Sequence, residues 1–152
     1  MNEPRIRPTM KIRLIVVDDE KDITDLLVRH FAFKGYDIVG VNDPRQALAM
    51  IEEENFNIVI SDIVMPIMDG LELLRRIKNY NGGIQVIMIT GYVTMHNILT
   101  AMRRGAETVF FKPLNNLDRL EEAIGQCISR IEMWQNILRE LGALGKTGQP
   151  YA

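Results

Sequence analysis

The feature that most constrains the fold of this chain is a regular alternation of short apolar runs with segments of helical periodicity. The apolar runs are about five or six residues long, which is a normal length for a β-strand. Several are apolar without interruption, as expected for parallel strands that are covered on both faces. The predicted strands are Ile12–Val17, Tyr36–Val41, Asn57–Ser61, Ile84–Ile89 and Thr108–Phe111.

The intervals between these runs are predicted to be helices, because their apolar residues recur on one helical face. Leu71, Leu74 and Ile77 show this spacing in the third interval. Helix starts are marked as well, since Asp43 stands at an N-cap position and Pro44 follows at the first helical position. The strand-helix repeats favour an α/β fold, in which a five-stranded parallel sheet is doubly wound with five helices on its two faces.

Length, charge and cysteine content narrow the class of protein. The chain has 152 residues and a formal net charge of −2, which fits one domain and gives no reason to expect binding to nucleic acid. Its single cysteine, Cys127, cannot form an internal disulfide, which favours a reducing compartment. No apolar run approaches the roughly 20 residues that span a bilayer. We therefore expect a cytoplasmic protein without membrane insertion and without direct nucleic-acid binding.

Chemically distinctive side chains follow four of the predicted strands. Asp18 and Asp19 follow the first strand, and Asp62 follows the third. Thr90 follows the fourth strand and Lys112 follows the fifth. Ligands of open α/β sheets bind outside the carboxyl ends of the strands. We therefore expect these side chains to meet in one crevice.

The residue types in this crevice suit magnesium and a phosphoryl group. Three neighbouring carboxylates repel one another unless a cation lies between them, and Mg²⁺ takes oxygen ligands and commonly bridges to phosphate. Lys112 supplies a positive charge for phosphoryl oxygens, and Thr90 supplies a hydroxyl donor. A carboxylate can also act as the nucleophile that accepts a phosphoryl group, which yields an aspartyl phosphate.

Four motifs give the chain a resemblance to the receiver domain of two-component response regulators, the CheY-like superfamily. They are VVDDE at 16–20, SDIVMPIMDG at 61–70, MITGY at 88–92 and FKP at 111–113. The resemblance covers about residues 12–129 and implies the strand order 2-1-3-4-5. It also implies a signalling switch that is phosphorylated by a sensor histidine kinase or a phosphotransfer protein. The surface formed by the fourth helix, the fifth strand and the fifth helix would then signal to a partner.

The resemblance implies a role for each residue that matches a motif. Asp62 resembles the phosphoacceptor, Lys112 the lysine that contacts the phosphoryl oxygens, and Thr90 the switch hydroxyl. The resemblance implies ligands of Mg²⁺ at Asp18, Asp19, Asp62 and the backbone carbonyl of Val64. The bond from Lys112 to Pro113 is expected to be cis. Such a protein catalyses its own phosphorylation and dephosphorylation and is not a conventional enzyme.

Three positions depart from the family pattern. Val109 occupies the position, three residues before Lys112, where the family usually has Tyr or Phe as part of its switch. Phe110 follows it and is expected to point to the opposite face of the sheet. Val64 and Tyr92 stand two residues after Asp62 and Thr90, where they flank the path of water to the phosphoryl group. Neither side chain orients water well, so we expect slow self-dephosphorylation.

The last predicted helix is longer than a receiver needs. Its apolar residues recur at alternating spacings of three and four, which is the seam of a heptad repeat. The seam consists of Leu117, Leu120, Ile124, Cys127, Ile131, Trp134, Leu138 and Leu141. We divide the chain into a flexible N-terminal arm at 1–11, a receiver domain at 12–129 and a helix extension with a tail at 130–152.

The extension predicts an interaction surface, because an apolar stripe that includes a tryptophan marks a contact site when it is exposed. One hypothesis is parallel self-association into a homodimer through Ile131, Trp134, Leu138 and Leu141. Another is that the chain is a receiver fragment of a larger regulator, whose extended last helix drives dimerisation or couples to a missing output domain. A third is that the helix bends back onto its own domain.

Other classes of protein with a related fold or chemistry fit the sequence less well. A flavodoxin-like FMN carrier needs a Ser, Thr or Gly phosphate loop after the first strand, where this chain has DDEKD. An aspartyl-nucleophile phosphatase carries a DxD motif after the first strand, whereas Asp62 follows the third. A nucleotide-binding enzyme needs a Gly-rich loop, which the sequence lacks.

Overall fold

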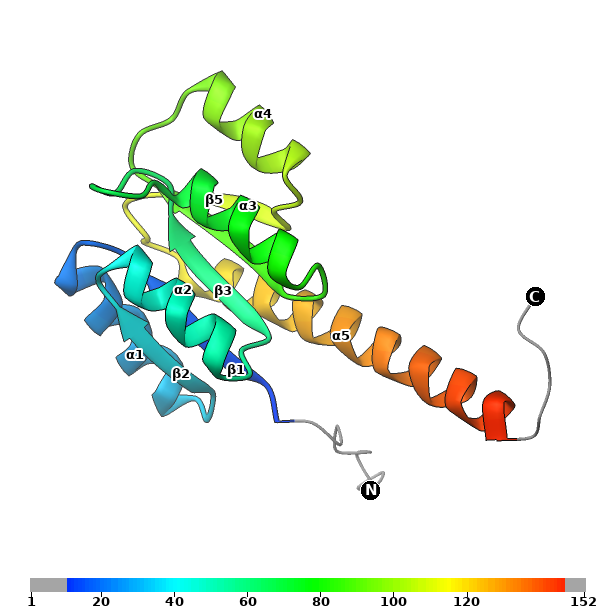
Figure 1. Ribbon diagram of the computed structural model, residues 1–152. Coiled ribbons are helices and arrows are strands. Elements are labelled where there is room, and N and C mark those ends of the chain that lie inside the picture. The colour runs from blue at the N-terminus through cyan, green and yellow to red at the C-terminus, as the bar shows by residue number, and fades with distance from the viewer. Residues whose placement is uncertain (1–10, 147–152) are drawn as a thin grey trace.

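Strands and helices alternate through the part of the chain that the structure describes, residues 11–146 of a computed structural model (Figure 1). The strands are β1 (Arg13–Val17), β2 (Asp37–Val41), β3 (Ile58–Asp62), β4 (Gln85–Thr90) and β5 (Thr108–Phe111). The helices are α1 (Lys21–Phe33), α2 (Pro44–Glu53), α3 (Gly70–Tyr80), α4 (Met95–Arg103) and α5 (Leu117–Lys146). The predicted arm at 1–11, except residue 11, and the tail after 146 lie outside the described residues.

The strands form one parallel sheet in the order β2-β1-β3-β4-β5. The prediction of a doubly wound five-stranded sheet with five helices is confirmed, and so is the order that the family resemblance implies. Val17 at the end of β1 pairs with Ser61 of β3, and Asp62 pairs with Ile89 of β4. The carboxyl ends of these central strands are therefore nearly level.

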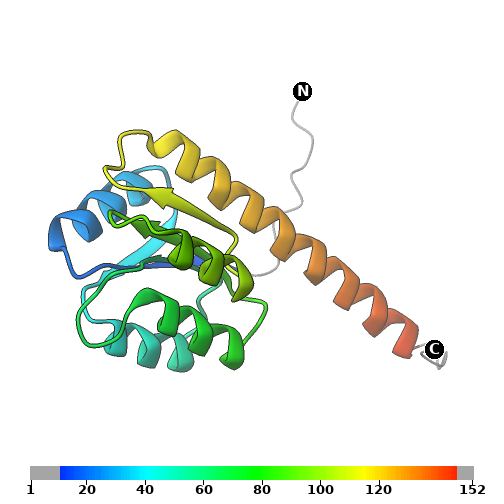
Figure 2. The ribbon, with the colours of Figure 1, turned by 90° about the horizontal axis from the view of Figure 1, so that it is seen from above.

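The sheet separates two hydrophobic cores, because successive strand residues point to opposite faces. Ile58 and Ile60 of β3 pack in the core under α1 and α5, together with Phe31 and Ile124. Val59 points the other way, into the core under α2 and α3. Figure 2 shows α5 crossing one side of the sheet, with α2 and α3 on the other. Both faces of the central strands are covered, which explains their continuously apolar sequences.

The starts of α2 and α3 have the predicted caps. The Asp43 carboxylate accepts a hydrogen bond from the backbone N–H of Arg45 at 2.8 Å, and Pro44 occupies the first helical turn. The Asp69 carboxylate accepts from the backbone N–H of Glu72, also at 2.8 Å. Each carboxylate satisfies a backbone donor that has no partner within its helix.

The helix α5 starts in the core and then leaves the domain, as both ribbon views show (Figures 1 and 2). Its buried positions continue to Ile131, which is 8% exposed and belongs to the core under α1 and α5. Trp134, one turn later, is 55% exposed. The prediction that Ile131 belongs to the exposed interaction surface of the helix extension is therefore wrong, because Ile131 is buried in the core of the domain. None of the helices in residues 11–146 combines the length and apolar character needed to cross a membrane.

A polar contact fixes α5 at the point where it leaves the sheet. The guanidinium of Arg130 forms an ion pair with Glu107, directly before β5. It also donates to the side-chain oxygen of Gln85, the first residue of β4, at 3.2 Å. We call Arg130, Glu107 and Gln85 the exit clasp. It connects the start of two neighbouring strands to the last buried turn of α5.

We predict that Ile131→Ala lowers the free energy of unfolding by about 2–4 kcal/mol, because it removes buried methyl groups and leaves a cavity. Phe33→Ala is the control, since the Phe33 side chain is 92% exposed and its truncation should change stability by less than about 0.5 kcal/mol. Urea unfolding followed by circular dichroism measures both. Equal stabilities of the Ile131 variant and the parent chain would contradict the placement of Ile131 in the core.

Candidate functional site

The carboxyl edge of the sheet brings together Asp18, Asp62 and Thr90, which are buried, and Lys112, which is largely covered. Asp18 directly follows β1, whereas Asp62 and Thr90 are the last residues of β3 and β4. Lys112 directly follows β5. The predicted convergence is therefore a cluster in which each side chain is positioned by the end of a different strand, and we call this cluster the pocket.

The ammonium group of Lys112 lies among the carboxylates of this pocket. Its Nζ is 2.9 Å from Asp18 Oδ2, 3.0 Å from Asp62 Oδ2 and 3.4 Å from Glu20 Oε1. Buried carboxylates need such a partner, because an isolated charge is poorly solvated in the protein interior. Lys112 therefore compensates the negative charge that the strands bring together.

Burial and pairing have opposite effects on the ionisation of these groups. Burial raises the pKa of both Asp18 and Asp62 above the usual value, and the interaction with Lys112 opposes that rise. Burial also lowers the pKa of Lys112, but its hydrogen bonds to the two aspartates outweigh this effect and leave its pKa above the usual range. Lys112 is therefore positively charged at neutral pH.

Among residues 11–146, the carboxylates of Asp18, Glu20 and Asp62 form a group whose ligand atoms all lie within 4.8 Å of one another. Oxygen donors of this kind are the ligands that Mg²⁺ prefers. Glu20 is not among the predicted ligands. The side chain of Asp19, which is predicted as a ligand, is exposed and is not part of this group. The second carboxylate of the DDE triplet and the Val64 carbonyl stay predictions as ligands.

A local turn explains the position of Glu20. Its backbone N–H donates to Asp18 Oδ1 at 2.9 Å, so the chain turns around the first aspartate before α1 begins. This turn brings Glu20 over the pocket and leaves Asp19 on the outside. The only signal in the sequence was an acidic residue two positions after Asp18.

Thr90 is buried, and its hydroxyl is engaged by the loop that follows β4. The hydroxyl donates to the carbonyl oxygen of Tyr92 at 2.9 Å and accepts from the Tyr92 N–H at 3.0 Å. It therefore does not donate to Asp62 in this structure. Moving the hydroxyl toward Asp62 requires the loss of at least the bond to the Tyr92 carbonyl.

The loop between β3 and α3 packs closely against Asp62. A Cβ atom at Gly70 would lie 1.8 Å from the Asp62 carbonyl oxygen, so only glycine fits there. Ile67, at the tip of the loop, has a φ of 75° and a side chain that is 74% exposed. A β-branched residue rarely adopts this conformation, which is strained.

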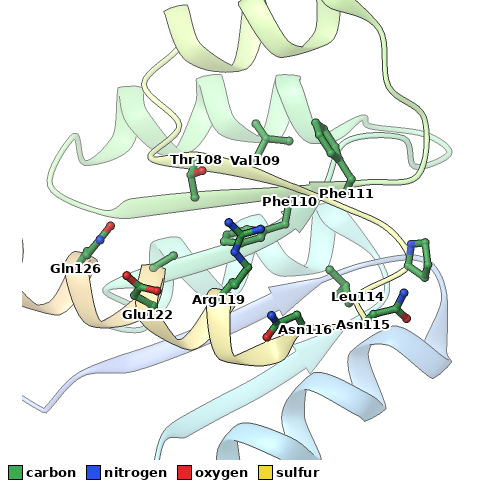
Figure 3. A pocket seen from close by; sticks show the side chains of 12 residues that line it. Thr108, Val109, Phe110, Phe111, Leu114, Asn115, Asn116, Arg119, Glu122 and Gln126 are labelled. Carbon is green, nitrogen blue, oxygen red and sulfur yellow. The ribbon is translucent and has the colours of Figure 1, made fainter.

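Two grooves flank β5 next to this pocket. One lies between β5 and α5 and is lined by Phe110, Arg119 and Glu122 among others (Figure 3). The other lies between β5 and α4 and is lined by Val109 and Met102 among others. Val109 and Phe110 pack against different cores, which confirms the prediction that they face opposite sides.

The bond between Lys112 and Pro113 is cis, as expected from the family resemblance. Val64 and Tyr92, the two residues predicted to flank the path of water, both have exposed side chains. The Val64 N–H donates to Asp62 Oδ1 at 3.3 Å. Both residues therefore contact the pocket through their backbones, Val64 at Asp62 and Tyr92 at Thr90, and present their side chains to solvent.

The fold and the pocket define a doubly wound α/β domain that gathers carboxylates, a lysine and a threonine at one edge of its sheet. A family model for the response regulator receiver domain matches residues 14–125. The chain therefore belongs to the receiver domain family of two-component response regulators.

Individual relatives agree with this assignment. The Regulator of RpoS from Escherichia coli K12 is 31% identical over 144 residues, which cover 91% of this chain and 43% of that protein. The Regulatory protein AtoC of the same organism is 29% identical over 137 residues, which cover 90% of this chain and 30% of that protein. The chain thus spans less than half the length of these curated relatives.

Solved receiver structures have the same fold. A CheY-like receiver domain protein from Methanospirillum hungatei JF-1 has a TM-score of 0.75 and 32% identity, over 80% of this chain and 97% of that one. A solution structure of the beryllofluoride-activated NtrC4 receiver domain dimer has a TM-score of 0.74 and 30% identity, over 80% of this chain and 99% of that one.

We predict that Ile67→Gly raises the free energy of unfolding by about 1 kcal/mol, because glycine adopts a positive φ without strain. Val93→Gly is the matched control, since Val93 is also an exposed β-branched loop residue but has no positive φ. Its replacement should lower stability. Chemical unfolding of both variants without magnesium tests this, and a loss of stability in both would contradict the strain at Ile67.

Proposed function

We propose that this chain is a phosphorylation-controlled switch that accepts a phosphoryl group on Asp62 from a histidine kinase or a phosphotransfer protein. One observation carries the proposal: Asp62 lies with Asp18 and Lys112 in one buried pocket, and Lys112 Nζ is 3.0 Å from Asp62. The family to which the chain belongs supports the same conclusion. The chain acts on its own aspartate and is not a conventional enzyme.

In the proposed reaction, an Asp62 carboxylate oxygen attacks the phosphorus atom of the donor. The bond between phosphorus and the donor nitrogen breaks, and its electron pair stays on that nitrogen. Lys112 exchanges a carboxylate partner for a phosphoryl oxygen. Bound Mg²⁺ would neutralise phosphoryl charge. The groups available to hold it are Asp18, Asp62, Asp19, Glu20 and the Val64 carbonyl.

The switch follows from the hydrogen bonds that exist before phosphorylation. The phosphoryl group adds negative charge and acceptor oxygens next to Thr90. The Thr90 hydroxyl then leaves the Tyr92 carbonyl and donates to the phosphoryl group, so the loop between β4 and α4 rearranges. The surface of α4, β5 and α5 changes as a result. Val109 contributes a smaller side chain to this change than the usual aromatic residue.

The length of the relatives supports a second statement about this switch. The matched relatives are more than twice as long as the region they share with this chain. We propose that the receiver works within, or together with, a larger regulator, and that α5 is the connection to its output.

We expect a small phosphodonor such as acetyl phosphate, with Mg²⁺, to add one phosphoryl group to the chain and none to the Asp62→Asn variant. Asp22→Asn is the matched control, because Asp22 is an exposed aspartate on α1. Intact mass spectrometry gives the stoichiometry, and peptide mapping after borohydride reduction gives the position. A modification that persists in Asp62→Asn would contradict the assignment of the phosphoacceptor.

We also expect the aspartyl phosphate to be long-lived, because Val64 and Tyr92, which contact the pocket through their backbones, do not orient an attacking water. Val64→Asn should shorten its lifetime severalfold, since an amide can hold water near the phosphorus atom. Val93→Asn, at another exposed valine nearby in the chain, is the control. Decay of the phosphorylated form after removal of the donor is the measurement. A parent lifetime of seconds would refute the expectation.

A further inference from the structure

The half of α5 beyond Ile131 has an apolar face that the sheet does not cover. Leu138 is 63% exposed, although an apolar residue of this size gains most when it is buried. We call the following exposed residues the projecting stripe: Trp134, Ile137, Leu138, Leu141 and Leu144. Trp134, Leu138 and Leu141 continue the heptad positions that Ile124 and Cys127 occupy inside the core, and Ile137 and Leu144 lie beside them.

The stripe is presented by a helix that is already ordered. The first half of α5 is packed on the sheet, so the projecting half extends an existing helix and needs no new nucleation. The exit clasp holds the last buried turn through Arg130. The projecting half continues straight out of the domain and does not fold back over it (Figure 2). Its own domain is therefore not the cover of the stripe.

The composition of the projecting half fits a second copy of this chain. The stripe contains no charged residue, and the charged residues Glu132, Arg139 and Glu140 lie on other faces of the helix. Two stripes can therefore meet without burying an ion. The charges near the stripe are also of both signs, so two copies do not repel each other strongly.

The packing of the first half of α5 determines whether two such helices can pair in parallel or in antiparallel orientation. The stripe lies on the side of α5 that faces its own sheet, because it continues the buried heptad positions. In a parallel pair, the first half of the second helix would lie where the first copy has its sheet and α1. In an antiparallel pair, the first half of the second helix and the domain attached to it lie beyond the C-terminal end of the first helix. Only the antiparallel arrangement leaves room for both domains.

The side chains agree with an antiparallel pair. Centring the overlap places Leu138 opposite Leu141 of the second copy, and Trp134 opposite residue 145, which is glycine. At each end of the overlap, the tryptophan of one helix then packs against the glycine of the other. Ile137 meets Leu144 of the second copy along one flank, whereas a parallel pair would set Ile137 against a glutamine or a glycine.

We propose that the projecting half of α5 pairs with the same segment of a second copy in antiparallel orientation, with the two domains at opposite ends. The interface is a short two-helix contact, and each stripe covers the other. This arrangement differs from the parallel homodimer predicted from the heptad spacing, and it excludes Ile131.

Sedimentation equilibrium of the unphosphorylated chain tests the association. The parent should be a dimer at micromolar concentrations, and Leu138→Asp should weaken dimerisation at least tenfold. Asn136→Asp is the matched control, because it adds the same charge in the same turn on the opposite face and should leave the dimer intact. A monomeric parent, or equal association of the parent and Leu138→Asp, would overturn the proposal. Normal phosphorylation of Leu138→Asp on Asp62 keeps this result separate from the proposed switch.

Cysteine pairing tests the orientation. Ile137→Cys and Leu144→Cys face each other only across an antiparallel pair, and both positions are exposed in the single chain. A mixture of the two variants should form a disulfide between copies under mild oxidation, and each variant alone should not. Cys127 does not interfere, because burial raises the pKa of its thiol to about 11. A disulfide between two copies of Trp134→Cys, with none in the mixture, would show a parallel pair and refute the orientation.

Discussion

The pocket depends on one cation that lies among three carboxylates. Lys112 follows the edge strand β5, yet its ammonium group reaches past β4 to Asp62 after β3 and to Asp18 after β1. Without that charge, the carboxylates would be poorly compensated in a buried site, which is costly. The same contact ties the end of the edge strand to the centre of the sheet. The contact of Lys112 with Asp18 and Asp62 therefore both compensates the buried negative charge and holds the edge strand to the centre of the sheet.

The architecture could be predicted from the sequence because it depends on periodic patterns. Short continuous apolar runs such as Val86–Ile89 are typical of strands with two covered faces, and the intervals between the runs have the spacing of helices. The convergence of Asp18, Asp62, Thr90 and Lys112 followed from their places at strand ends, since parallel strands end at one edge. The strand order needed the family resemblance, because periodicity does not say which strands are neighbours.

Two details could not be predicted, and each has a local physical reason. The presence of Glu20 in the carboxylate group results from a turn in which the Glu20 N–H donates to Asp18. Nothing in the letters DDE reveals that turn. The burial of Ile131 was missed because heptad spacing identifies the face of a helix and not the surface that covers it. The heptad positions before and after Ile131 are all apolar, although only those up to Ile131 are covered by the domain.

The exit clasp has a mechanical consequence for α5. Arg130 joins the starts of β4 and β5, the two strands whose other ends lead to Thr90 and Lys112. The helix extends about 24 Å beyond Arg130 to its end at Lys146, given the rise of an α-helix. Arg130 is therefore the point about which the projecting half of α5 would tilt. A tilt of a few degrees at Arg130, too small to disturb the packing of the core, would move the far end of the helix by an ångström or more.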